Sequence, residues 1–462
     1  MAAKTQAQPR RNSLRDLFAH PLAAAILSVA YVVITGFLLF SLDRRSLWFP
    51  AMNMCVFPLF VLSPLIILAA PLKPAAKTTL VLVLMVIVMP IIGMYNTTYL
   101  ELAIQIAIFA GLALGLNIVV GFAGLLDLGY VAFFAVGAYL WAMFTSPADT
   151  IFTVNGWSVP SWAFYIFIFI GVGIAGLVGV LLGLPVLRLR GDYLAIVTLG
   201  FGEMIRVLVR NLDSPINFTN GSQGLHNIGR PETPDFVYRI TNGIITSFNI
   251  PTENVDFVAR QVTFYFLSMA ALLVIVLLAR RLENSPIGRA WTAIREDEEA
   301  AIAMGVPLVR MKLLAFAMGA SFAGAIGVLY ASKQTFIDPS SFVLLQSIQI
   351  LAMVIVGGIG GIRGVILGAI IVTLLDLHIL SNLSQQLSAL RNVHFVVPII
   401  NFDIANWPQE LEPAKYQPFV FGLILVLMML FRPAGLTPER RRRLELQEIA
   451  CGRRAYVART AR

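Results

Sequence analysis

Long apolar runs, separated by short stretches that hold most of the charge, constrain this chain more than any other feature. Of its 462 residues, 58% are hydrophobic and 13% are charged, whereas a soluble globular protein carries roughly 25% charged residues. A run of ~20 apolar residues is long enough to cross a hydrocarbon core ~30 Å thick. The pattern excludes a soluble enzyme and predicts an all-α membrane protein, a polytopic helical bundle with about 12 (10–12) transmembrane or re-entrant segments.

Three of the predicted spans are poor candidates for plain crossings. The Gly121–Gly124 connection is too tight for an ordinary loop, the span 193–209 carries Glu203 and Arg206, and the span 342–356 ends in a glycine cluster. We expect broken or re-entrant segments there, because irregular backbone survives at membrane depth only where protein or water surrounds it. The predicted spans are 21–40, 51–70, 79–94, 100–120, 125–144, 162–186, 193–209, 262–278, 313–331, 342–356, 362–380 and 418–431.

Basic residues in the connections predict the orientation, because cytoplasmic loops carry an excess of lysine and arginine. Residues 145–160 contain neither and 211–260 contain only three arginines, so both connections are expected outside. The connection 279–312 holds six basic residues and is expected in the cytoplasm together with both termini. Arg44 and Arg45 do not fit this scheme, because it places both of these basic residues outside. The net charge of +9 lies beside apolar runs, which favours lipid headgroups over nucleic acid as its partner.

The connection also predicts a short amphipathic helix over 285–305 at the membrane surface. Ser285 is a favourable N-cap followed by proline, and Gly305 is a favourable C-terminal residue. Ile287, Trp291 and Ile294 recur at helical spacing. We expect Trp291 to be an exposed aromatic side chain that docks into a groove of a partner. A helix that only rests among the headgroups remains the alternative.

Within this helix, Glu299-Ala300-Ala301 followed by Gly305 resembles the EAA-x-x-x-G signature of ATP-binding-cassette importer permeases. In that family, this cytoplasmic helix docks onto the ATPase subunit. The resemblance implies an ATPase-coupling role for Gly288, Arg289, Glu299, Ala300, Ala301 and Gly305.

Further stretches resemble the branched-chain amino acid permease family, and within it the M-type subunits. They are 115–121 with Gly129-Tyr130 and 137–140, then 183–193, 198–203 and the loop 219–225. The resemblance covers roughly residues 100–435. It implies an N-terminal extension over 1–98 with about three transmembrane helices, a permease core over 99–432 with the coupling loop 280–312, and a basic cytoplasmic tail over 433–462.

The resemblance also implies a function and partners. We expect a permease that moves leucine, isoleucine and valine into the cytoplasm across the bacterial inner membrane, with no cofactor. The implied partners are an H-type permease subunit, two cytoplasmic ATP-binding subunits and a periplasmic amino-acid-binding protein. The chain has no G-x-x-x-x-G-K-[ST] loop, so the ATPase would be a partner. A urea or short-amide importer and a gradient-driven secondary transporter remain alternatives.

Polar and glycine-rich positions at membrane depth are candidates for the substrate path, because intramembrane polar groups are functional hypotheses by default. The segments 119–124 and 355–360 resemble each other, as internal repeats of transporters do. Asp192 is expected to pair with Arg188 or Arg190, and Glu203 with Arg206. The predicted path residues are Asn117, Gly121, Gly124, Glu203, Gly357 and Gly360, and the predicted binding-protein docking residues are Thr219, Asn220, Gly221 and Gly224.

The remaining candidate motifs favour no enzyme and no bound metal or dinucleotide. Cys55 and Cys451 lie far apart and form neither a disulfide framework nor a metal site. The G-x-G-x-x-G match at 171–176 lies inside an apolar run, where its glycines are expected to permit close helix packing.

Overall fold

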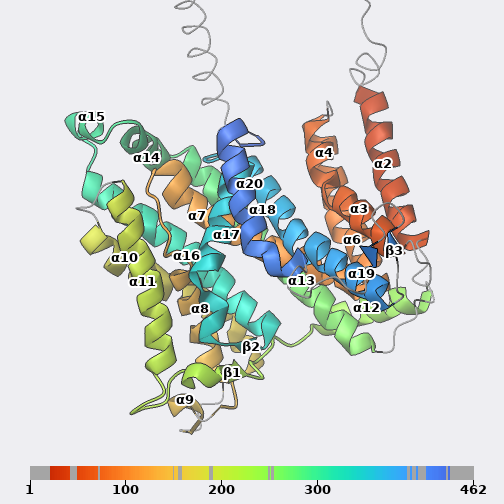
Figure 1. Ribbon diagram of the computed structural model, residues 1–462, viewed down its shortest axis with the longest axis horizontal. Helices are drawn as coiled ribbons and strands as arrows, with labels where there is room; N and C mark the ends of the chain where they lie inside the picture. The colour runs from red at the N-terminus through yellow and green to blue at the C-terminus, as the bar shows by residue number, and fades with distance from the viewer. Residues whose placement is uncertain are drawn as a thin grey trace, which may run out of the picture. The chain divides into compact units, whose positions relative to one another are not determined.

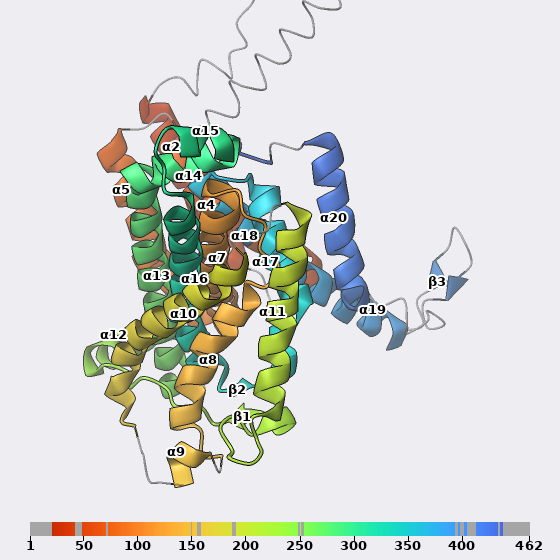
Figure 2. The same ribbon diagram turned by 90° about the vertical axis from the view of Figure 1, so that its left-hand side faces the viewer.

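The computed structural model is helical over almost all of its described residues (Figures 1 and 2). The only strands in this part of the chain are two short antiparallel pairs: β1 (Leu225–His226) with β2 (Phe336–Ile337), and β3 (Val396–Val397) with β4 (Phe402–Asp403). The structure describes residues 21–41, 49–70, 73–148, 150–154, 159–186, 191–247, 250, 254–392, 396–397, 402–403, 413–432 and 435–437.

Six helical stretches of the described chain are long and apolar enough to cross a membrane, and four shorter apolar helices accompany them. This confirms the predicted polytopic helical membrane protein. The six stretches are Ala75–Tyr95, Thr97–Phe122, Ser161–Pro185, Val255–Glu283, Leu308–Gln334 and Ile362–Gln386.

The chain divides into two compact units, one formed by Met1–Leu100 with Ile240–Val258 and the other by Glu101–Arg239 with Ala259–Arg462. This is a division by packing, and the functional boundary expected at residue 98 stays a prediction. The first unit holds α2 (Pro21–Ser41), α3 (Phe49–Val61), α4 (Ser63–Ala69), α5 (Pro74–Val83), the π-helical η1 (Leu84–Val88), α6 (Met89–Tyr95) and the end of α12 (Asp235–Ser247).

The second unit contains the two most buried of the long helical stretches, Thr97–Phe122 and Leu308–Gln334. Its first half holds α7 (Thr97–Asn117), η2 (Ile118–Phe122), α8 (Val131–Thr145), α9 (Ile151–Val154), η3 (Ser161–Ala163), α10 (Phe164–Val186), α11 (Asp192–Asn211) and η4 (Gly221–Gln223). Its second half holds α13 (Val255–Glu283), α14 (Pro286–Glu296), α15 (Glu298–Ala303), α16 (Leu308–Gln334), η5 (Pro339–Phe342), α17 (Leu344–Gly357), α18 (Ile362–Thr373), η6 (Leu374–Leu380), α19 (Ser381–Asn392), η9 (Pro413–Tyr416) and α20 (Gln417–Phe431).

Helix α16 is central to this unit and packs against α8 and α10 (Figure 2). Glycine allows these backbones to approach closely. A Cβ atom added at Gly137 of α8 would lie 2.7 Å from the Cα of Gly324 on α16, and one added at Gly179 of α10 would lie 2.7 Å from the Cβ of Ala320. The G-x-G-x-x-G match lies within the continuous helix α10. The expectation that its glycines permit helix packing is confirmed at Gly171, where an added Cβ would lie 2.9 Å from Val328.

Every predicted span coincides with helical residues, with two differences inside the spans. The span predicted from residue 125 begins only at Val131, because the backbone from Ala123 to Tyr130 is not helical. A break was expected within 193–209, and this was wrong, since α11 is continuous. Glu203 and Arg206 lie one turn apart on it and pair with each other at 2.8 Å, which reduces the cost of the two charges without any break.

The connection 211–260 contains an element that the sequence reading did not include. Helix α12 follows Pro234 and opens with Asp235, a favourable residue in a first turn. It is only 13 residues long and half-exposed, so no apolar run marks it.

Candidate functional site

The connection between α13 and α16 lies at one end of the second unit, and β1 and β2 lie at the other end (Figure 1). Ser285 caps α14 as predicted, since its Oγ accepts a hydrogen bond from the Gly288 amide at 3.2 Å. Gly305 follows the last turn of α15 with a φ of +82°. The single helix expected over 285–305 is wrong. Asp297 interrupts it and caps α15, its carboxylate accepting from the amides of Glu299 at 2.9 Å and Ala300 at 3.0 Å.

Trp291 is buried within the chain itself. Its side chain has 0% exposure, and its indole Nε1 donates to the Met311 carbonyl on α16 at 2.8 Å. The expectation that Trp291 is exposed for docking into a partner was therefore wrong. The apolar stripe of α14, which includes the 2% exposed Ile294, covers the start of α16 instead.

An ion pair holds α15 to α16 as well. Lys312 of α16 lies 2.5 Å from the Glu298 carboxylate, and the lysine side chain is only 4% exposed. Because a buried ammonium needs a partner, this pair fixes where α15 lies. The two short helices are therefore anchored on α16 by an aromatic side chain and by a charge pair.

Four of the six predicted coupling residues are exposed on this anchored connection, namely Arg289, Glu299, Ala300 and Gly305. The other two are buried and shape it: a Cβ added at Gly288 would lie 2.6 Å from the Glu283 carbonyl oxygen, and Ala301 is 3% exposed.

Two large apolar side chains stand out on the same surface. Ile302 is 50% exposed and Met304 is 85% exposed. Ile302 follows directly on Glu299-Ala300-Ala301 and Met304 comes two residues later; neither was expected from the sequence. We define the coupling surface as Arg289, Glu299, Ala300, Ile302, Met304 and Gly305.

Four of the predicted path residues come together in one closely packed region. Asn117, 1% exposed at the end of α7, accepts a hydrogen bond through Oδ1 from the Gly360 amide at 2.9 Å. A Cβ added at Gly121 would lie 2.8 Å from the Gly360 nitrogen, and one at Gly357 would lie 2.9 Å from the Cα of Val365. We call 117–124 and 357–360 the glycine joint.

The two similar glycine-rich segments of the sequence are thus direct neighbours in the structure. Both interrupt the membrane helices as expected. The first passes through the π-helical turn η2 into Gly124 at a φ of +73°, and the second through Gly358 at +116° and Gly360 at +91°. Glycine adopts these positive angles without the strain that other residues would meet.

Arg295, in the last turn of α14, contacts the first half of this joint. Its guanidinium donates to the carbonyl of Gly121. A Cβ added at Gly124 would lie 2.6 Å from the Cγ of Arg295, so the arginine stem lies directly on the backbone there. Sequence reasoning missed this contact, because Arg295 is one of six basic residues of the connection and no local pattern separates it from the others.

The segment after α20 contacts the second half of the joint. The amides of Leu436 and Thr437 donate to the carbonyls of Val356 at 3.0 Å and Gly357 at 3.2 Å. The sequence offered no sign of this contact, because it joins residues 80 positions apart through backbone atoms.

Glu203, the other predicted path residue, lies on α11. Its carboxylate is paired with Arg206, and the two side chains remain 37% and 34% exposed. Gly200, one turn earlier, is also exposed, and a Cβ added there would meet nothing within 4 Å. The opposite face of α11 is closely packed, since a Cβ at Gly129 would lie 2.8 Å from the carbonyl carbon of Thr198.

The other candidate carboxylates have local partners where the structure describes them. Asp127 accepts from the Gly129 amide at 2.9 Å, and Asp376 accepts from the Gln349 side chain at 2.8 Å. The side chain of Asp192 and the two arginines expected to pair with it lie outside the described residues. Within the described chain, no group of three or more His, Cys, Asp and Glu residues is placed to hold a metal ion.

At the opposite end of the unit, the predicted docking residues form a constrained loop. Thr219 is 1% exposed and donates to the Val209 carbonyl at 2.6 Å. Asn220 adopts a φ of +58° and donates to the Gly224 carbonyl at 2.9 Å. Gly221 and Gly224 are buried. These residues shape the loop, while Ser222 and Gln223 at its tip are exposed.

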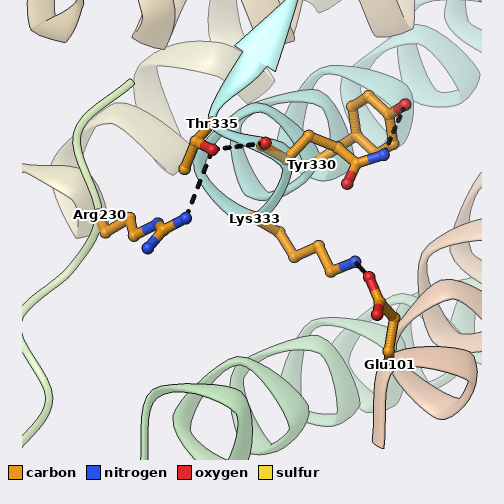
Figure 3. Close-up of polar contacts among 6 residues, drawn as sticks. Glu101, Arg230, Tyr330, Lys333 and Thr335 are labelled. Carbon is orange, nitrogen blue, oxygen red and sulfur yellow. Dashed lines mark hydrogen bonds and ion pairs between the residues drawn. The ribbon is translucent and has the colours of Figure 1, made fainter. Parts of the chain in front are cut away.

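The same end contains a second buried lysine (Figure 3). Lys333 of α16 pairs with Glu101 of α7 at 2.6 Å, with side-chain exposures of 4% and 52%. In Figure 3, Arg230 points from the loop after β1 toward Thr335, to which it donates at 3.4 Å. The Lys333–Glu101 pair joins α16 to α7, and the Arg230–Thr335 bond joins the loop to the end of α16.

Comparison with known proteins identifies the family. The family of branched-chain amino acid transport system permease components matches residues 98–429. The chain belongs to this family. The resemblance expected from the sequence motifs is confirmed, and with it a transport permease rather than an enzyme.

Individual relatives agree with this assignment. The high-affinity branched-chain amino acid transport system permease protein LivM of Salmonella typhimurium is 35% identical over 354 residues, 75% of this chain and 72% of that protein. LivM of Escherichia coli K12 is 35% identical over 357 residues, 76% of this chain and 72% of that protein. A probable LivM of Methanocaldococcus jannaschii is 24% identical over 268 residues, 57% of this chain and 65% of that protein.

No solved structure matches the chain significantly. The apolar helices together with the bacterial relatives identify a multi-pass inner-membrane permease of this family.

Proposed function

We propose that this chain is the transmembrane permease subunit of an ATP-binding-cassette importer that carries leucine, isoleucine and valine into the cytoplasm. The substrate class follows the two LivM relatives that are 35% identical to it. Partner ATPase subunits supply the energy, since the chain has no phosphate-binding loop of the usual type.

The coupling surface is the single observation that carries this proposal. Met304 is 85% exposed and Ile302 is 50% exposed, on a connection that Trp291 and the Lys312–Glu298 pair anchor to α16. Large apolar side chains exposed on an anchored element suit a groove of a partner protein. In our proposal, the ATPase binds this surface and pulls on it, and both chain termini lie on the same cytoplasmic side.

The exposed face of α11 supports a second permease subunit, of the H type. Glu203 lies eight residues before the end of α11, about 12 Å along the axis at 1.5 Å per residue. A charge pair at that depth is costly against lipid, yet both side chains are about a third exposed. A neighbouring subunit that covers this face removes the cost, and the open space at Gly200 admits a close helix approach.

We place the substrate path along Glu203 and the glycine joint, which includes Asn117, Gly121, Gly124, Gly357 and Gly360. The joint is closed in this structure, so it acts as the gate of the path. A periplasmic binding protein docks on the loop that Thr219, Asn220, Gly221 and Gly224 shape and presents the amino acid to the permease.

Reconstitution tests the proposal. Proteoliposomes holding this chain, its candidate permease partner, both ATPases and the binding protein are expected to take up labelled leucine only with ATP, and isoleucine and valine should compete. Met304→Glu should abolish uptake, because it places a charge in the apolar contact, whereas Met304→Leu should retain it. ATP-dependent uptake of urea in place of leucine would support the proposed mechanism but contradict the proposed substrate. Transport by the chain alone, driven by a proton or sodium gradient, would overturn the ATPase assignment.

A further inference from the structure

We infer that Arg295 is the positioning residue that transmits movement of α14 to the glycine joint, and that Asn117 carries this movement across to Gly360. The inference rests on the proposed function, because it requires an ATPase partner that displaces the coupling surface. It goes further by assigning the connection between that surface and the breaks in the membrane helices to particular side chains.

The first step is the contact between α14 and the end of the first broken helix. Arg295 donates to the carbonyl of Gly121, which lies in the π-helical turn where α7 ends. A hydrogen bond from a guanidinium is stronger than one between neutral groups. The stem of Arg295 lies on Gly124, where an added Cβ would lie only 2.6 Å from its Cγ. A movement of α14 therefore pushes or pulls the backbone of 121–124 directly.

The second step crosses to the other half of the joint. Asn117 Oδ1 accepts from the Gly360 amide at 2.9 Å, between residues 243 positions apart in the chain. Gly121 lies between Arg295 and this hydrogen bond. Its carbonyl accepts from Arg295, and a Cβ on Gly121 would lie 2.8 Å from the Gly360 nitrogen. Closely packed interiors change between discrete arrangements rather than deforming smoothly. The two breaks therefore move as one element.

The third step extends the movement beyond the joint. The carbonyls of Val356 and Gly357, at the end of α17, accept hydrogen bonds from Leu436 and Thr437. A displacement of 357–360 thus reaches the segment after α20 as well. One arginine on the coupling connection is in this way linked to the ends of α7, α17 and α20.

A cap of the terminal carbonyls of α7 is the simpler role for Arg295, since arginine commonly occupies such positions. A cap alone would affect stability, and uptake and ATP hydrolysis would then fall together. A transmitting residue has a different signature: the complex still assembles and hydrolyses ATP, but each hydrolysis event moves less amino acid.

The experiment measures leucine uptake per ATP hydrolysed in the complete reconstituted importer. Arg295→Gln keeps the stem that packs on Gly124 and removes the guanidinium, and Asn117→Ala removes the second step. Each is expected to lower the ratio by about tenfold or more, within the range of coupling between sites. The double variant should be no worse than the worse single variant, because both act in one path. Arg239→Gln, which removes an exposed arginine of α12 outside the coupling loop, is the matched control and should keep the ratio within about twofold.

A distance measurement covers the case in which Arg295→Gln does not assemble. Leu126 follows the first half of the joint and Arg363 follows the second half, and nucleotide binding should shift the separation of spin labels at these two positions in the wild-type complex. The shift should disappear in Arg295→Lys, which keeps the charge and most of the stem but lacks the forked guanidinium.

Three outcomes would overturn the inference: an unchanged ratio in Arg295→Gln, a fall in the double variant equal to the product of the single falls, or a preserved nucleotide shift in Arg295→Lys. An unchanged ratio that comes from a proportional fall of uptake and hydrolysis would assign Arg295 to capping alone. If the wild-type complex shows no ATP-dependent uptake of any solute, the proposed function itself fails and this inference fails with it.

Discussion

Replacing Trp291 with phenylalanine should loosen the α14–α15 connection locally and leave the membrane helices folded. The Trp291 side chain is fully buried, and its Nε1 donates to the Met311 carbonyl at 2.8 Å. Phenylalanine keeps an aromatic ring in the site but has no N–H group. The Met311 carbonyl, which lies inside the helix α16 and keeps the amide of the next helical turn, therefore loses the indole as its second donor.

The size of the effect follows from the lost hydrogen bond and the smaller ring. One hydrogen bond contributes about 0.5–1.5 kcal/mol net, and the smaller ring adds a packing loss of similar size and the same sign. A loss of about 2 kcal/mol corresponds to roughly a 30-fold shift in the equilibrium between the docked and the detached connection, since 1.4 kcal/mol is a factor of ten.

Hydrogen exchange of the chain in lipid nanodiscs measures this equilibrium directly. Peptides that cover Pro286–Ala303 should exchange about 30-fold faster in Trp291→Phe, because local opening governs exchange of such segments. The centre of α16 should exchange as in the wild type. Met304→Ala is the matched control, since Met304 is 85% exposed on the same connection, and it should leave the rates unchanged.

Two outcomes would refute this reasoning. Unchanged exchange over the connection would mean that the Trp291 hydrogen bond contributes nothing to docking. Faster exchange shared by α8 and α10 would mean that α14 belongs to the global fold and does not open as a separate element.

Two further predictions concern the membrane helices, and thermal unfolding in detergent followed by size exclusion checks both. Gly137→Ala should destabilise the chain by about 1–3 kcal/mol through overpacking, because its Cβ would lie 2.7 Å from the Gly324 Cα. Gly173→Ala, which meets nothing within 4 Å, should be neutral or stabilising, and equal effects would contradict the packing argument. Glu101→Gln should destabilise by about 1–3 kcal/mol, because it leaves the ammonium of Lys333, 4% exposed, without its charge partner. Lys333→Met should destabilise the chain less than Glu101→Gln, because the carboxylate of Glu101 is 52% exposed and stays hydrated. A larger destabilisation by Lys333→Met would contradict this argument.

Local sequence patterns predicted most of the helices, because the start, the end and the apolar length of a helix depend on residues that are close in the sequence. Apolar runs located the spans. Ser285 located the start of α14, and Gly305 located the end of α15. The i,i+3 spacing of Glu203 and Arg206 predicted their ion pair. The glycines and Asn117 marked both breaks, because glycine permits backbone angles that a regular helix excludes.

Contacts between distant segments were not predictable in the same way. An amphipathic stripe on α14 predicts that one face is covered, but headgroups, a partner and α16 would all satisfy it. The partner of Trp291 is the Met311 carbonyl, 20 residues away, and no side-chain pattern marks a carbonyl. The short α12 was missed for a related reason: it is too short and too polar to produce an apolar run.

The glycine joint shows how residues chosen from the sequence can meet in the structure in a way that the choice did not foresee. Asn117, Gly121, Gly357 and Gly360 were selected because polar and glycine-rich positions at membrane depth are candidates for a substrate path. In the structure all four are buried, and Gly360 contacts both Asn117 and Gly121. A solute can therefore reach these atoms only after the two breaks separate. Arg295 joins α14 to one of the breaks. Under the function proposed above, the energy for that separation therefore enters at α14, and the proposed path residues act first as a gate.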